Sequence, residues 1–205
     1  MLTISKTWEK WGKSIDDQIN LLGINRWREF PEIIKTIEFN NKTHYYKYFD
    51  TYMPMINTES PHIIEFGAGF GGMSELFLTI AEVRLTNIDI DPMLKLQKHY
   101  LANNKYLGRV QFIPTLKADS IQWDQSYFFS TFAFTETTPE TWEHYIQNFF
   151  PKVSAVYILG SKGWGEDNLP EFNWDKLSSV FKRTKVEEKI LGGVPGIEFF
   201  GYNFI

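Results

Sequence analysis

The chain has 205 residues, 43% of them hydrophobic and 17% aromatic, with a formal net charge of −4 and no cysteine. This length suits one folded core with a short appendage. Without cysteine there can be no disulfide, zinc-thiolate site or thiol nucleophile, and no apolar run approaches the roughly 20 residues that cross a bilayer. The lack of a basic cluster disfavours nucleic acid as a partner. We therefore expect a cytoplasmic protein that binds neither nucleic acid nor membranes.

Residues 1–58 are expected to form a helical cap that packs on the core. Apolar residues recur at helical spacing between Trp8 and Leu22, and again between Ile33 and Ile37. An aromatic run follows at residues 45–52 and is closed by Pro54. The aromatic side chains of this region could stack on an acceptor molecule, or they could form the interior of the cap.

From residue 59 onward, short apolar runs alternate with helical stretches, which is typical of β-α units around a parallel sheet. The predicted strands cover residues 63–66, 83–90, 110–113, 127–134 and 153–159. Residues 186–205 carry Gly192 and Gly193, then Pro195 and Gly196, between two strand-like runs, which indicates a hairpin. The sequence therefore predicts an α/β fold over residues 59–205, with a Rossmann-like, mostly parallel sheet and an antiparallel C-terminal hairpin.

The first predicted strand runs into a glycine loop, E-F-G-A-G-F-G-G, at residues 65–72. Gly67 allows a tight turn off the strand, Gly69 lets a ligand approach the backbone, and Gly71 or Gly72 lets the next helix pack close to the sheet. A dinucleotide site would space its glycines G-x-G-x-x-G, and the acidic residue at the strand end would repel a pyrophosphate but suit a sulfonium ligand with an amino group.

This loop resembles the E/D-x-G-x-G-x-G pattern of class I S-adenosylmethionine-dependent methyltransferases. The resemblance implies S-adenosyl-L-methionine as the cofactor. The residues that it assigns to the cofactor are Glu65, Gly67, Ala68, Gly69 and Gly71.

A carboxylate at the end of the next strand is expected to accept hydrogen bonds from the ribose hydroxyls of such a cofactor. Asp89 lies at that strand end, whereas Asp91, just before Pro92, is expected to cap the following helix. The two roles could be reversed. Asp119 and Ser120 follow the third strand, and they either border the adenine or form a turn or N-cap pair.

A narrower resemblance covers about residues 62–150. The segments DIDPMLKLQKHYL, at 89–101, and FSTFAFTETTPETWEHY, at 129–145, are similar to segments of the sugar O-methyltransferase family. Pro92, Tyr100 and Leu101 match the spacing of that family, whereas its acidic residue before the proline would fall on Ile90. The resemblance implies methylation of a hydroxyl on a sugar or another small molecule, such as a nucleotide-linked sugar.

Methyl transfer needs the acceptor oxygen, methyl carbon and sulfur in line, and a nearby base can take the hydroxyl proton. Glu136, just past the fourth strand, is the first candidate, and its alternative role is an acid at the start of the helix near Pro139. His144 falls in that helix, where it could reach the same pocket or lie on the surface.

The loop at residues 160–168 is expected to form part of the acceptor wall. No clustered set of carboxylates and imidazoles is evident, so no metal is expected.

Other functions remain open at this point. The protein could methylate another class of acceptor, either a small metabolite or a protein, although the lack of an N/D-P-P-Y/F segment after the fourth strand favours oxygen over nitrogen. It could also bind the cofactor without catalysis. A nicotinamide-dependent oxidoreductase ranks last, because neither G-x-G-x-x-G nor a Tyr-x-x-x-Lys pair lies in the expected place.

Overall fold

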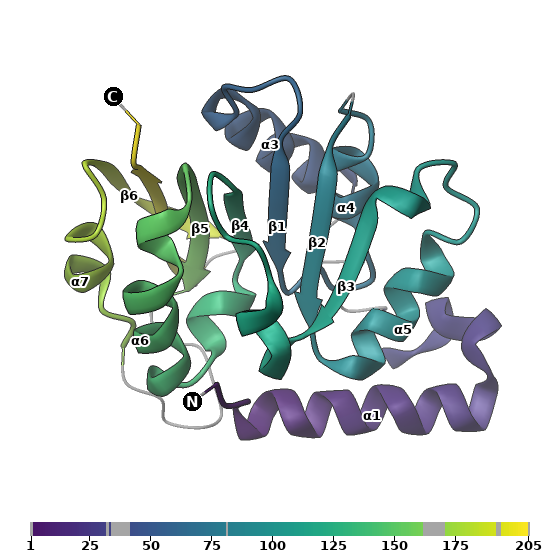
Figure 1. Cartoon of the computed structure of the whole chain (residues 1–205). Helices are drawn as coiled ribbons and strands as arrows, with labels where there is room; N and C mark the ends of the chain where they lie inside the picture. Colours follow the sequence, from purple (N-terminus) through teal and green to yellow (C-terminus); the bar gives the residue numbers. More distant parts are fainter. Residues whose placement is uncertain are drawn as a thin grey trace.

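The structure is a computed structural model, and it describes residues 2–31, 33, 42–80, 82–161, 171–191 and 194–204. Within these residues a seven-stranded sheet has the order β3-β2-β1-β4-β5-β7-β6 (Figure 1). Its strands are β1 (His62–Phe66), β2 (Arg84–Asp89), β3 (Val110–Pro114), β4 (Tyr127–Thr131), β5 (Ala155–Ser161), β6 (Arg183–Leu191) and β7 (Val194–Tyr202). Strands β1 to β5 pair in parallel, and β7 is antiparallel to its neighbours β5 and β6. The predicted fold class is confirmed.

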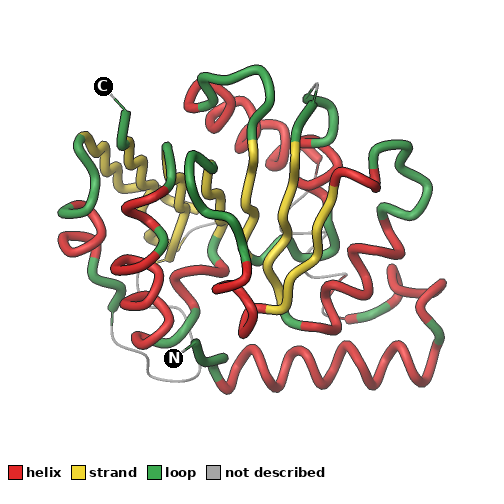
Figure 2. Tube along the Cα trace, viewed as in Figure 1, coloured by secondary structure: helices red, strands yellow, loops and turns green. Residues whose placement is uncertain are grey.

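Helices lie on both faces of this sheet, and one further helix runs along an edge (Figure 2). The α-helices are α1 (Lys6–Leu22), α3 (Lys42–Tyr52), α4 (Gly72–Phe77), α5 (Asp91–Tyr100), α6 (Pro139–Asn148) and α7 (Trp174–Ser178). Short 3-10 helices that bear on the site are η1 (Ile24–Glu29), η4 (Thr115–Ser120) and η5 (Ala133–Glu136). Among the described helices, none is long and apolar enough to span a membrane.

The alternation of side chains along the central strands explains why both faces are covered. On β4, Phe128 packs in one hydrophobic cluster with α6, whereas Phe129 packs in another with α3 and α4. Every residue of β1 is buried. A strand that is buried on both faces carries a nearly continuous apolar run, which is the pattern that the sequence shows at residues 62–66.

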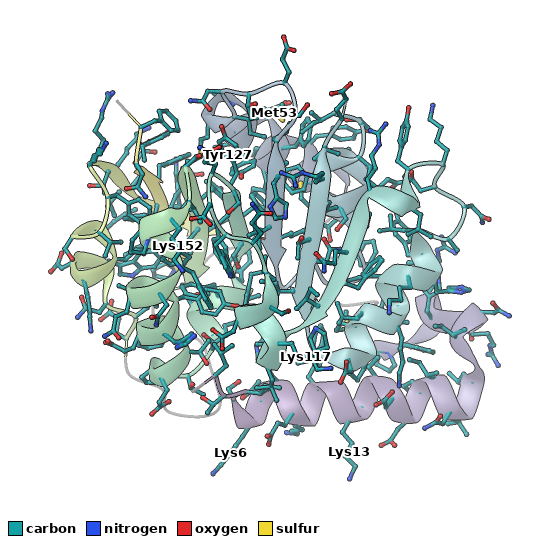
Figure 3. All side chains as sticks on the ribbon, viewed as in Figure 1. Lys6, Lys13, Met53, Lys117, Tyr127 and Lys152 are labelled. Carbon is teal, nitrogen blue, oxygen red and sulfur yellow. The ribbon has the colours of Figure 1, made fainter. Side chains whose placement is uncertain are left out.

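Helix α1 crosses the carboxyl edge of the parallel strands. Its N-cap Ser5 accepts a hydrogen bond from the Trp8 amide at 3.3 Å, and its buried face carries Trp8, Gly12 and Ile15. A methyl added to Gly12 would lie 2.9 Å from the side chain of Ile90, the residue that follows β2. Figure 3 places Tyr127, at the start of β4, at the opposite edge of the sheet. The predicted helix between Trp8 and Leu22 is therefore present, and it faces the loops that follow β1 and β2.

The ends of several elements differ from the predictions. Strand β4 ends at Thr131 rather than at residue 134, because Phe132 adopts a positive φ of 67° and η5 follows it. Pro195 and Gly196 lie inside β7, paired with Ile190 and Lys189, and not in the turn. The predicted turn at Gly192 and Gly193, and the predicted helical residues 34–37, fall outside the described residues.

Gly67 makes a close approach between β1 and the segment after β4. It has a φ of +73°, and an added Cβ would lie 2.0 Å from the Cβ of Ala133. We expect Gly67→Ala to lower the free energy of unfolding by about 3 kcal/mol, since it combines a clash with a left-handed backbone. Urea denaturation measures this change. Gly108→Ala is the control, because a methyl there would meet nothing within 4 Å; equal stability of the two variants would contradict the prediction.

Candidate functional site

The glycine loop between β1 and α4 is held in a conformation that side chains rarely adopt. Gly67, Gly69 and Gly71 have φ values of +73°, +58° and +104°. The Gly67 amide donates to the Ile88 carbonyl at 2.8 Å, and the Gly71 amide donates to the Ala68 carbonyl at 2.9 Å. A Cβ added at Gly69 would meet nothing within 4 Å. The loop is therefore tied to β2 on one side and leaves open space at Gly69, where a ligand can approach the backbone.

Asp89 is the last residue of β2, and it is buried. One carboxylate oxygen accepts from the Ile90 amide at 2.9 Å, and the other accepts from the Gln97 side chain, also at 2.9 Å. Burial raises the pKa of Asp89 to about 7, although hydrogen bonds from the Ile90 and Gly69 amides oppose this rise. Asp89 thus lies against the glycine loop, where the sequence placed the ribose carboxylate.

Asp91 has a different place from the one predicted. It is the first residue of α5, and the N-cap is Ile90, which makes no side-chain capping bond. The prediction that Asp91 caps the helix is therefore wrong. Its carboxylate is exposed within the first turn, where it can interact favourably with the helix dipole.

Glu65 is buried on β1, the strand next to β2, and it pairs in register with Asn87. It accepts a hydrogen bond of 2.6 Å from the Ser74 hydroxyl of α4. Burial raises the pKa of Glu65 to about 8, and the negative charge of Asp89 adds to this rise. Both carboxyl groups that the motif assigns to the cofactor are therefore poised to gain or lose a proton near neutral pH.

Glu136 lies in η5, directly after β4, and its side chain is half-buried. Burial raises the pKa of this carboxyl, and a hydrogen bond from the Trp8 side chain of α1 partly offsets the rise. The N-cap of α6 is Thr138, and the acid in its first turn is Glu140. Glu136 thus precedes the helix and faces Trp8, so the helix-start alternative does not describe its position.

His144 of α6 and Asp119 of η4 form a pair. The His144 Nε2 atom lies 2.8 Å from an Asp119 carboxylate oxygen, and Asp119 is exposed. Ser120 is also exposed, and its hydroxyl donates to the Lys117 carbonyl at 2.7 Å. Lys117 marks this segment in Figure 3, at the edge of the sheet that α1 crosses. The structure therefore brings together His144 and Asp119, two residues that the sequence had placed in separate roles.

Aromatic residues from the segment before β1 and from α5 surround Phe70 of the glycine loop. Trp27 stacks on Phe70 with ring centroids 5.4 Å apart, and Tyr45 and Tyr100 meet the same ring edge-on at 6.0 and 5.3 Å. Trp27 is buried, and Trp8 lies 3.3 Å from the position of a Cβ on Gly67. These side chains fix the loop from outside, which favours the interpretation as cap interior for Trp27.

Sequence reasoning missed three residues of this region, Ser74, Asn87 and Gln97, and it also missed the contact between Trp8 and Glu136. One signal was available for Gln97: Met93, Gln97 and Leu101 form a buried stripe at helical spacing, so an amide occupies a core position. Residues 162–168 of the predicted acceptor wall lie outside the described residues. Across the described ranges, no group of three or more His, Asp or Glu residues is arranged to hold a metal ion.

No family model and no curated protein sequence matches this chain. Solved structures do match. The N-terminal domain of EvdMO1, crystallised with S-adenosylhomocysteine, aligns with a TM-score of 0.59 and 10% identity over 77% of this chain and 80% of that one. A Haemonchus contortus phosphoethanolamine N-methyltransferase, bound to S-adenosylhomocysteine, aligns with a TM-score of 0.63 and 13% identity over 92% of this chain.

This chain spans only 58% of the length of the Haemonchus contortus enzyme. The mitomycin 7-O-methyltransferase MmcR aligns with a TM-score of 0.52 and 12% identity, over 96% of this chain and 67% of its own. The strand order, the antiparallel β7 and these similarities together define the fold. It is the class I fold of S-adenosylmethionine-dependent methyltransferases.

The raised pKa values of Glu65 and Asp89 predict how stability depends on pH. Carboxyl groups in the unfolded chain lose their protons near pH 4. In the folded state, Glu65 keeps its proton up to about pH 8 and Asp89 keeps its proton up to about pH 7. Between these limits the folded state binds more protons, so raising the pH lowers the free energy of unfolding, by about 1.4 kcal/mol per pH unit for each proton.

We therefore expect the melting temperature of the ligand-free protein to fall between pH 5 and pH 8. Glu65→Gln should make this fall shallower, since it removes one of the two titrating groups. Thermal unfolding followed by circular dichroism measures both slopes. Identical slopes in the wild type and the variant would show that Glu65 does not titrate in this range.

Proposed function

We propose that this protein is an S-adenosylmethionine-dependent methyltransferase that acts on a hydroxyl of a sugar or another small molecule. The observation that carries the proposal is the open space at Gly69, at the carboxyl edge of the sheet, in a loop whose backbone donates a hydrogen bond to the buried carboxyl group of Asp89. Glu65 is buried on the neighbouring strand β1. Open α/β sheets bind their ligands at this edge. The presence of S-adenosylhomocysteine in structures of the same fold supports the choice of cofactor.

The chemistry of the carboxyl groups fits this cofactor. A cationic sulfonium and an amino group favour ionised carboxylates nearby, whereas a pyrophosphate would be repelled by them. The protein already supplies hydrogen-bond donors to both Glu65 and Asp89, from Ser74 and Gln97. The donors keep each carboxylate in place when it is ionised, which leaves its outer lone pairs for ribose hydroxyls or an amino group.

Bound S-adenosylmethionine supplies a methyl group on a sulfonium, which an acceptor oxygen can take in a single displacement. Glu136 is the base that we assign to this reaction, because it follows β4 at the carboxyl edge and is held by the Trp8 indole. Its raised pKa strengthens it as a proton acceptor at neutral pH. The proton of the acceptor hydroxyl passes to the Glu136 carboxylate and then to solvent.

An oxygen acceptor is favoured by the segment after β4, Phe132-Ala133-Phe134, which lacks the N/D-P-P-Y/F pattern. A sugar finds support in the structure of the EvdMO1 N-terminal domain determined in the presence of D-fucose, which has the same fold at 11% identity. A small acceptor, in preference to nucleic acid, also fits the net charge of −4. The absence of cysteine suits a reducing compartment, so we propose that the protein acts in the cytoplasm.

Calorimetric titration tests the cofactor assignment. We expect micromolar binding of S-adenosylmethionine and S-adenosylhomocysteine, and none of NAD. Gly69→Asn should weaken both by about 100-fold, since its side chain fills the open space while asparagine tolerates the φ of +58°. Gly108→Asn is the control. Binding of NAD alone, or full affinity in Gly69→Asn, would overturn the assignment.

Glu136→Gln tests the base. We expect kcat for a hydroxyl acceptor to fall by about 100-fold with little change in cofactor affinity, because only the proton acceptor is lost. Glu140→Gln, an exposed acid in the first turn of α6, is the matched control. The substrate panel contains nucleotide-linked sugars, small phenols and amines. Turnover of amines only would refute the oxygen acceptor, and cofactor binding with no turnover of any substrate would favour a non-catalytic binding protein.

A further inference from the structure

A continuous chain of buried polar side chains connects Asp89 with Glu65 behind the glycine loop. From Asp89, the chain passes through Gln97 of α5, Asn87 of β2 and Ser74 of α4. The Asn87 amide donates to Gln97 Oε1 at 3.1 Å and to the Ser74 hydroxyl oxygen at 2.8 Å. All five side chains are buried. The two carboxyl groups that flank the glycine loop are therefore joined by a single hydrogen-bonded path.

Gln97 is the member of this chain that reaches the loop itself. Its Nε2 group donates to the Gly69 carbonyl at 2.9 Å and to an Asp89 carboxylate oxygen at 2.9 Å. Both of its N–H groups are thus used, and its Oε1 accepts from Asn87. With every group of the amide engaged, its orientation is fixed, and it holds the carbonyl of Gly69 and the carboxylate of Asp89 at a set separation.

The position of Gln97 is unusual for an amide. It is fully buried on α5, in the same stripe as Met93 and Leu101, where an apolar side chain would pack without needing partners. Because folding exchanges water hydrogen bonds for internal ones, a satisfied buried amide adds little net stability over an apolar side chain of the same shape. The specific contacts of Gln97 thus point to a role in the site.

We propose that Gln97 is a positioning residue for the cofactor, which orients the Asp89 carboxylate toward the ribose hydroxyls and locks it to the backbone of Gly69. This inference rests on the proposed function, since it assumes that the cofactor binds at Gly69. Gln97 acts through Asp89 and not by touching the ligand. Without its amide, Asp89 keeps its backbone donors but loses the contact that sets its direction.

A double-mutant cycle tests this role by titration with S-adenosylhomocysteine. Gln97→Met keeps the length of the side chain and removes both donors, and we expect about tenfold weaker binding. Asp89→Asn removes the carboxylate. If Gln97 acts through Asp89, Gln97→Met should cause no further loss in the Asp89→Asn background. Lys98→Met, the next residue on α5 and exposed, is the control and should leave affinity unchanged.

A second experiment measures whether Gln97 acts on the ribose hydroxyls, by using an analogue of S-adenosylhomocysteine that lacks them. Gln97→Met should weaken the natural ligand but leave the affinity of the analogue within twofold of wild type. Equal losses for both ligands, or additive losses in the cycle, would show a merely structural role and overturn the proposal. Gln97→Leu also lacks the donors and carries no charge, and it takes the place of Gln97→Met if that variant does not fold.

The outcomes separate the two proposals. If the wild-type protein binds neither S-adenosylmethionine nor S-adenosylhomocysteine, the proposed function and the role of Gln97 both fail. If the wild type binds S-adenosylhomocysteine and both Gln97 variants bind it as tightly as the wild type, only the role of Gln97 fails.

Discussion

Two carboxylic side chains, Glu65 and Asp89, are buried on adjacent strands beneath the glycine loop, and a buried carboxylate costs several kcal/mol unless it has partners. The partners come from different parts of the chain: Ser74 on α4, Gln97 on α5 and the backbone of the loop. The position of each element therefore depends on the others. The positive φ values of the loop glycines are what allow its backbone amide to reach Asp89.

The residues before β1 pack against α5, α6 and the segment after β4. Helix α1 is anchored to α6 through Thr3, whose carbonyl accepts from the Thr141 hydroxyl at 2.8 Å, and to α5 through the ion pair of Asp16 and Lys95 at 2.7 Å. Between these anchors, Trp8 faces Glu136. Trp8 thus covers part of the carboxyl edge beside Glu136, and reduced contact with water strengthens the electrostatic interactions of a charged group.

The sheet and the glycine loop could be predicted because their signals are local. Apolar runs such as residues 62–66 and the spacing of Gly67, Gly69 and Gly71 need no knowledge of distant contacts. The partners of those residues could not be predicted in the same way, because Gln97 meets Gly69 only once α5 has packed on the sheet. The misplaced cap at Asp91 and the pairing of His144 with Asp119 have the same origin, since both depend on exact turn and helix ends.

Helix α1 contacts both Glu136 and the region of β1 and β2. Trp8 reaches Glu136, where we place the base, whereas the carboxyl groups near Gly69 are held by residues of β2, α4 and α5. The same face of α1 also touches the glycine loop side, since Trp8 lies 3.3 Å from the Cβ position of Gly67 and Gly12 packs against Ile90, whose amide donates to Asp89. A substitution on this face would therefore disturb the proposed base and the proposed cofactor side together, so that over evolutionary time the two sides could change only in concert.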